Sequence, residues 1–104
     1  MTLRMPQYLN TSPRWDTGLS VLEAELQAER ANALGKTGSE LETALATLNR
    51  STATGSERDL LVRAAARAAW SFFVQREACG LINHDQAIAH YSIPREVLAR
   101  VGAG

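Results

Sequence analysis

The sequence predicts an all-α protein, folded as a long antiparallel helical hairpin that is closed by two short C-terminal helices. Alanine and leucine supply most of the apolar residues, and this composition favours helix over sheet. Apolar residues recur at intervals of three, four and seven, which is the spacing of one helix face. A chain of 104 residues has room for one domain with one modest core.

The first element is a long helix that follows a short arm. Residues 1–15 are expected to form a flexible N-terminal arm, and residues 16–104 a single helical domain with its first cap at residue 16 or 17. The helix should run to about Asn49. A break in this helix at Gly35–Gly38 is an open alternative, because each glycine costs about 1 kcal/mol relative to alanine in a helix. We favour one long helix that can bend here, since no proline interrupts the apolar stripe.

Three shorter helices should follow. The second is expected to begin after the polar turn over residues 50–56 and to end at Gly80, which suits a left-handed C-cap. Asn83 should cap the third helix. Ser92–Pro94 should separate the third helix from a fourth, which has about two turns and stops at Gly102.

Aromatic residues of the second helix predict an interface. Trp70, Phe72 and Phe73 cannot share one helix face, because neighbouring side chains stand about 100° apart. At least one ring must therefore point away from the hairpin, and large exposed apolar patches mark interfaces. We expect a homodimer. The candidate interface residues are Trp70, Phe72, Phe73, Leu26, Leu41 and Leu45.

Charge and cysteine content narrow the class of partner and the compartment. The formal net charge is zero, whereas nucleic-acid binders usually carry a basic excess, so nucleic acid is an improbable partner. No apolar run of about 18 residues is present, so we expect no membrane span. The single cysteine, Cys79, cannot form an internal disulfide, and a reducing cytoplasmic location fits best.

The sequence offers no convincing catalytic, cofactor or metal site. Cys79, His84, Asp85 and His90 are the only cluster of reactive side chains. Cys79 lies near a helix C-terminus, where the helix dipole disfavours a thiolate. The two histidines are six residues apart, and metal ligands on one helix face are three or four apart. We therefore expect neither an enzyme nor a metalloprotein.

Residues 84–101 loosely match a helix-turn-helix reader of DNA. The candidate DNA contacts are Ser92, Arg95 and Arg100. Glu96 beside Arg95 would face phosphates, and the charges of residues 81–104 sum to zero, which argues against this interpretation. The favoured alternative is a lid on the hairpin. Its apolar residues would be Ile88, Tyr91, Ile93, Leu98 and Val101.

Three strings, LEAEL at 22–26, FVQREACGL at 73–81 and YSIPREVLARVG at 91–102, are similar to those of a family of short, uncharacterised, all-helical bacterial proteins. The resemblance implies a helical fold and assigns no activity. We predict a non-enzymatic protein that acts by binding an unknown protein partner or itself. The alternative is a small DNA-binding regulator.

Overall fold

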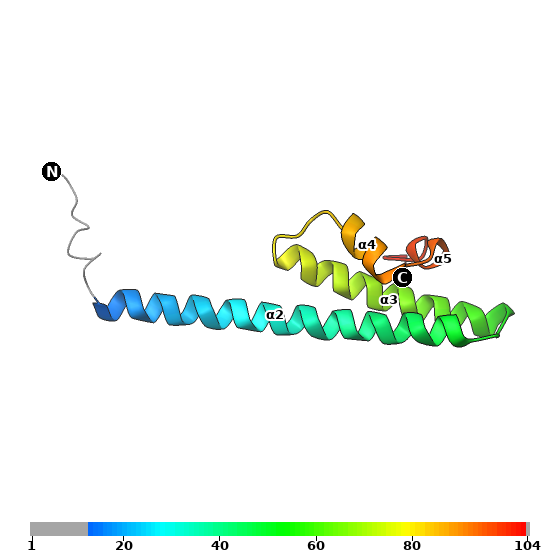
Figure 1. The fold of residues 1–104 in the computed structure, drawn as a ribbon, viewed down its shortest axis with the longest axis horizontal. Coiled ribbons are helices and arrows are strands. Elements are labelled where there is room, and N and C mark those ends of the chain that lie inside the picture. Colours follow the sequence, from blue (N-terminus) through cyan, green and yellow to red (C-terminus); the bar gives the residue numbers. More distant parts are fainter. Residues whose placement is uncertain (1–12, 104) are drawn as a thin grey trace.

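Two long antiparallel helices form the body of the molecule (Figure 1). The structure, a computed structural model, describes residues 13–103. Helix α2 spans Pro13–Arg50 and α3 spans Gly55–Ala78, followed by the short helices α4, Asp85–Tyr91, and α5, Arg95–Leu98. The molecule is elongated, with extents of 71 × 23 × 21 Å. The predicted hairpin with two short C-terminal helices is confirmed.

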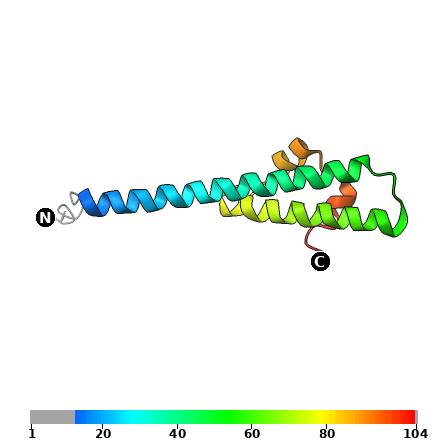
Figure 2. The ribbon, with the colours of Figure 1, turned by 90° about the horizontal axis from the view of Figure 1, so that it is seen from below.

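Helix α2 runs without a break through Gly35–Gly38, and Figure 2 shows no sharp kink there. It begins at Pro13, three residues before the earliest predicted cap. Proline suits the first turn of a helix, because the N–H that it lacks would have no partner there. The rest of the predicted arm, residues 1–12, lies outside the described residues.

Gly38 lies where side chains of α3 and α4 reach the backbone of α2. A Cβ at Gly38 would stand 2.8 Å from Tyr91 Oη and 3.2 Å from Phe72 Cε1. Both distances are shorter than ordinary van der Waals contact. A Cβ at Gly35, about one turn away, would meet nothing within 4 Å. The packing therefore favours glycine at position 38, whereas position 35 has room for a side chain.

We expect Gly35→Ala and Gly38→Ala to change the stability of the protein in opposite directions. At Gly35, alanine should raise the free energy of unfolding by about 1 kcal/mol through its higher helix propensity. At Gly38, overpacking by about 1–3 kcal/mol should outweigh that gain. Urea denaturation followed by circular dichroism measures both effects. Tyr91→Phe, which removes the closest atom, should restore part of the loss. Equal stabilisation by both alanines would contradict this packing.

Glycines with positive φ mark both ends of α3. Gly55 opens the helix at φ 65°, and Gly80 follows its last residues at φ 85°. The Gly80 N–H donates to the Glu77 carbonyl and the Leu81 N–H to the Arg76 carbonyl, each at 2.9 Å. This pair of bonds is a Schellman motif, so the left-handed cap predicted at Gly80 is confirmed.

The hairpin core lies between α3 and the second half of α2. Small side chains on α3 allow the two helices to approach closely, and leucines from one face of α2 fill the space beside them. The buried apolar side chains of the hairpin are those of Leu41, Leu45, Leu48, Val62, Ala65, Ala66, Ala69 and Phe72.

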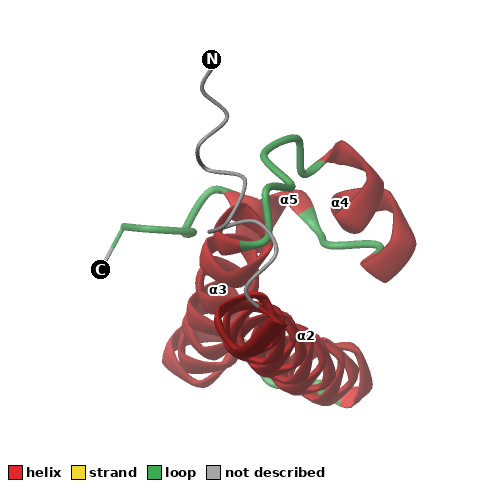
Figure 3. Ribbon diagram, turned by 90° about the vertical axis from the view of Figure 1, so that its left-hand side faces the viewer, coloured by secondary structure: helices red, strands yellow, loops and turns green. Residues whose placement is uncertain are grey.

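The two short helices lie together against one side of the hairpin (Figure 3). Ala87, Ile93 and Val97 are buried against its core. The other predicted lid residues are partly buried around them, namely Ile88, Tyr91, Leu98 and Val101. The segment is therefore a lid, as the apolar pattern predicts.

The helix boundaries in the lid differ slightly from those predicted. The N-cap of α4 is His84 rather than Asn83, although Asn83 Oδ1 still accepts the Asp85 N–H at 2.9 Å. Helix α5 ends at Leu98 and so has one turn instead of two. Two ion pairs, Arg58 with Glu96 and Arg100 with Asp59, attach this short C-terminal segment to α3.

Candidate functional site

The N-terminal part of α2 extends beyond the end of α3 and has no cover within the described chain (Figures 1 and 2). Helix α3 ends opposite Arg30, since the Sγ of Cys79 lies 4.0 Å from the Arg30 carbonyl oxygen. Every residue from Gly18 to Asn32 is exposed. We call this segment, residues 18–32, the overhang. At 1.5 Å per residue it is about 22 Å long.

Three leucines form an apolar stripe on the overhang. Leu19, Leu22 and Leu26 are 47%, 63% and 49% exposed. At 100° per residue, the three fall within about 60° of one another around the helix axis. A stripe at this spacing is what a helix normally buries against a neighbour. Here no described element covers it.

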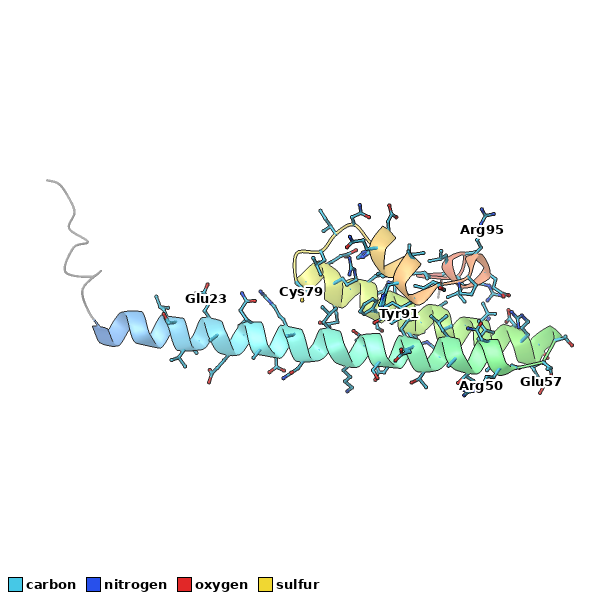
Figure 4. All side chains as sticks on the ribbon, in the orientation of Figure 1. Glu23, Arg50, Glu57, Cys79, Tyr91 and Arg95 are labelled. Atoms are coloured by element: carbon cyan, nitrogen blue, oxygen red, sulfur yellow. The ribbon has the colours of Figure 1, made fainter. Side chains whose placement is uncertain are left out.

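Acidic side chains border the leucine stripe. By the same helical geometry, Glu23 and Glu29 flank the stripe on its two sides. The overhang contains Glu23, Glu25 and Glu29 but only one base, Arg30, so it has two negative charges in excess. In Figure 4 the Glu23 side chain extends into open space beyond the end of α3. The overhang is therefore an apolar surface with an acidic border.

A second uncovered stripe lies on α3, on the face opposite the core. It consists of Leu60, Arg63, Arg67, Trp70 and Val74, which alternate at intervals of three and four. The apolar members Leu60, Trp70 and Val74 are 63%, 50% and 39% exposed. We call these five residues the outer stripe. Unlike the overhang, it combines apolar side chains with basic ones.

The outer stripe borders a hollow of about 380 Å³. Arg63, Arg67, Trp70 and Arg100 line it, together with Ala66, Gly102 and Ala103. Asp59 pairs with Arg100 and lies 3.3 Å from the Nε of Arg63. Three arginines against this one carboxylate leave the rim of the hollow positively charged. An acidic or apolar side chain of a partner would fit such a hollow.

Three of the six predicted interface residues belong to the core of the chain itself. Leu41, Leu45 and Phe72 are 0%, 4% and 5% exposed, so in this fold they have no surface to offer a partner. Phe73 is half-buried, because its ring stacks on that of His84 with centroids 4.5 Å apart. The predicted set therefore mixes core residues with surface residues.

Leu26 and Trp70 are exposed, as an interface residue must be. Sequence reasoning did not assign their neighbours on the two stripes to the interface. These are Leu19, Leu22, Leu60 and Val74. A usable signal was present, because the first predicted helix is clearly longer than the second. An antiparallel partner that is shorter by several turns must leave part of the longer helix uncovered.

The candidate DNA contacts are placed in a way that does not favour DNA reading. Ser92 takes a left-handed conformation at φ 52° and occupies the place that glycine usually takes in the turn. Arg95 points away from the hairpin in Figure 4, but α5 supports it with a single turn. Arg100 and Glu96 both pair with residues of α3. The lid therefore uses its charges within the chain.

The side chains considered for catalysis have structural contacts instead. His84 Nδ1 accepts a hydrogen bond from Arg76 Nε at 3.1 Å, and His84 Nε2 lies 2.9 Å from Glu77 Oε2. The ring of His90 packs edge-on against Tyr91. In the described part of the chain, no three His, Cys, Asp or Glu side chains are grouped so that they could hold a metal ion.

The fold and its two uncovered stripes define a helical-hairpin protein whose longer helix extends past its partner. No helix within residues 13–103 combines the length and apolar content that a membrane span requires. The chain belongs to a family of unknown function, DUF6665, whose model matches residues 1–104. Comparison with curated proteins and with solved structures gave no match.

Proposed function

We propose that the protein is a non-enzymatic interaction protein that binds helices of another polypeptide, one along the overhang and one along the outer stripe. The observation that supports this most directly is the run of exposed residues from Gly18 to Asn32, with three leucines on one face. Most helical stability in proteins comes from packing an amphipathic face against a neighbour. A partner that covers the leucines would supply that packing.

The size of the apolar surface indicates that both stripes take part. Full burial of a leucine side chain is worth about 1.5–3 kcal/mol, and the overhang leucines are about half-exposed. Covering all three would therefore contribute about 2–4 kcal/mol. Association costs at least about 4 kcal/mol in lost translational and rotational freedom. The overhang alone cannot give stable binding, so the exposed Leu60, Trp70 and Val74 must contribute as well.

The proposal predicts that a charge in the leucine stripe weakens binding strongly, whereas a charge on the other face of the overhang does not. Leu22→Asp places a carboxylate in the stripe. Val21→Asp is the matched control, because Val21 is 50% exposed and lies outside the stripe, about 100° from Leu22. We expect Leu22→Asp to weaken partner binding about thirtyfold or more, because about 1–2 kcal/mol of apolar contact is lost and the new carboxylate must also be desolvated in the interface.

Affinity capture with three immobilised baits tests this expectation. The baits are the wild type, Leu22→Asp and Val21→Asp, each exposed to lysate of the source organism and to the purified chain. Quantitative mass spectrometry should show partners that the wild type and Val21→Asp retain and Leu22→Asp loses. Circular dichroism checks that all three baits are helical. Identical retention by all three baits would refute the proposal.

A further inference from the structure

We infer that the helix which covers the overhang belongs to a second copy of this chain. The two copies would be turned end for end, so that the overhang of each protomer lies along the outer stripe of the other. The inference rests on the proposed function and names the partner. It follows from three properties that the two surfaces share: their length and position, their charge, and their apolar spacing.

The two surfaces match in length and in position along the molecule. The overhang is about 22 Å long, and the outer stripe from Leu60 to Val74 spans about 21 Å. They occupy consecutive lengths of the long axis, since α3 ends opposite Arg30, near the C-terminal end of the overhang (Figure 2). A twofold axis that is perpendicular to the long axis of the molecule and passes beside the end of α3 brings each overhang beside the α3 of the other protomer. Such an isologous pairing makes both contacts at once.

The charges of the two surfaces are complementary. The overhang has two negative charges in excess, with Glu23 and Glu29 beside its leucines. The outer stripe carries Arg63 and Arg67, and Arg100 lies at the same hollow. Opposite potentials across an interface set register and orientation. Pairing the two overhangs with each other would instead place like charges opposite each other. The pairing of each overhang with the outer stripe of the other protomer is therefore favoured.

The apolar side chains of the two surfaces have the same spacing. Leucines of the overhang recur at three and four residues, and so do the members of the outer stripe. Helices that pack side by side interlock side chains at this spacing. Trp70, beside the hollow of about 380 Å³, is the residue type that most often anchors an interface. An overhang side chain can enter that hollow.

The same arrangement would cover the remaining exposed apolar residues near the centre of the molecule. Leu81 and Ile82, just after the end of α3, are 44% and 78% exposed. They lie close to the boundary through which the twofold axis would pass. Because the contact between an overhang and an outer stripe is made twice, the dimer buries twice the apolar surface of one such contact. This doubling offsets the cost of association that a single stripe cannot meet.

A charge-swap experiment tests the pairing of the overhang with the outer stripe. One variant carries Glu23→Arg with Glu29→Arg, and the other carries Arg63→Glu with Arg67→Glu. Each variant alone should dimerise at least about tenfold more weakly than the wild type, because like charges then face each other. An equal mixture of the two should recover dimers, because both contacts of the mixed dimer again pair acids with bases. Glu42→Arg, on the exposed surface of α2 outside the overhang, is the control that should not change dimerisation.

Light scattering over a range of concentrations gives the mass, and circular dichroism verifies that each variant is folded. The expected result is a wild-type mass of twice 11.3 kDa, with loss in each variant and recovery in the mixture. A monomeric wild type at every concentration would refute the second copy. The proposed function would still stand if capture depended on Leu22. Dimers that neither variant weakens, or that the mixture does not restore, would refute the pairing of these two stripes.

Discussion

Replacing Phe72 by alanine is expected to lower the free energy of unfolding by about 3–5 kcal/mol. Phe72 is 5% exposed, and its ring links three helices. It packs edge-on against Tyr91 of α4 with centroids 5.2 Å apart, and it lies against the backbone of α2 at Gly38. Alanine would leave a cavity at the point where all three meet. Urea denaturation monitored by circular dichroism measures the loss.

Phe73→Ala is the matched control for this substitution. The substitution Phe73→Ala, at the adjacent residue, removes the same atoms as Phe72→Ala. Phe73, however, is only half-buried and stacks on His84. We expect it to cost about 1–2 kcal/mol, since less apolar surface is lost. If Phe73→Ala destabilised the protein as much as Phe72→Ala, the position of the core relative to α3 would be wrong.

Val97→Asp is expected to release the lid and to destabilise the protein by at least about 3 kcal/mol. Val97 is fully buried at 0% exposure. A carboxylate at this position would lose its hydration and would gain no charged or hydrogen-bonding partner in exchange. Hydrogen exchange should show loss of protection in α4 and α5, with less change in the middle of α2. Unchanged protection in α4 and α5 would contradict the packing of the lid.

Two neighbouring positions serve as controls for Val97. Leu98 is partly buried and Ala99 is exposed, so Leu98→Asp should cost less than Val97→Asp, and Ala99→Asp should have almost no effect. The order Val97, Leu98, Ala99 tests which side of the short α5 faces the hairpin. A larger loss for Leu98→Asp than for Val97→Asp would reverse that assignment.

The sequence was sufficient for the helices and for their order. The spacing of apolar residues gave the hairpin, and Gly80 gave the end of α3. The sequence alone does not show that a side chain is tolerated at Gly35 but not at Gly38, because both glycines lie in the same stretch of one helical pattern. The difference depends on Tyr91 and Phe72, which reach Gly38 only once the chain is folded. Contacts between residues distant in sequence decide such cases.

The candidate interface shows a similar division. An apolar stripe on α2 marks the side of the helix that faces inward, but it does not say how far α3 extends along that side. Leu41 and Leu26 therefore looked equivalent in sequence, although the first is buried and the second is 49% exposed. The length of α5 was also overestimated, because Leu98 and Val101 suit a helix as well as the turns that the chain forms there.

The packed half of α2 has a consequence for how the overhang forms. Starting a helix is unfavourable because several residues must be fixed for the first hydrogen bond, whereas each further residue adds one bond. The hairpin core fixes the second half of α2, so the overhang grows from an existing helix by propagation alone. Its leucines are then held in register before any partner arrives. Association with a preformed helix orders fewer residues, which favours binding by a surface of this modest size.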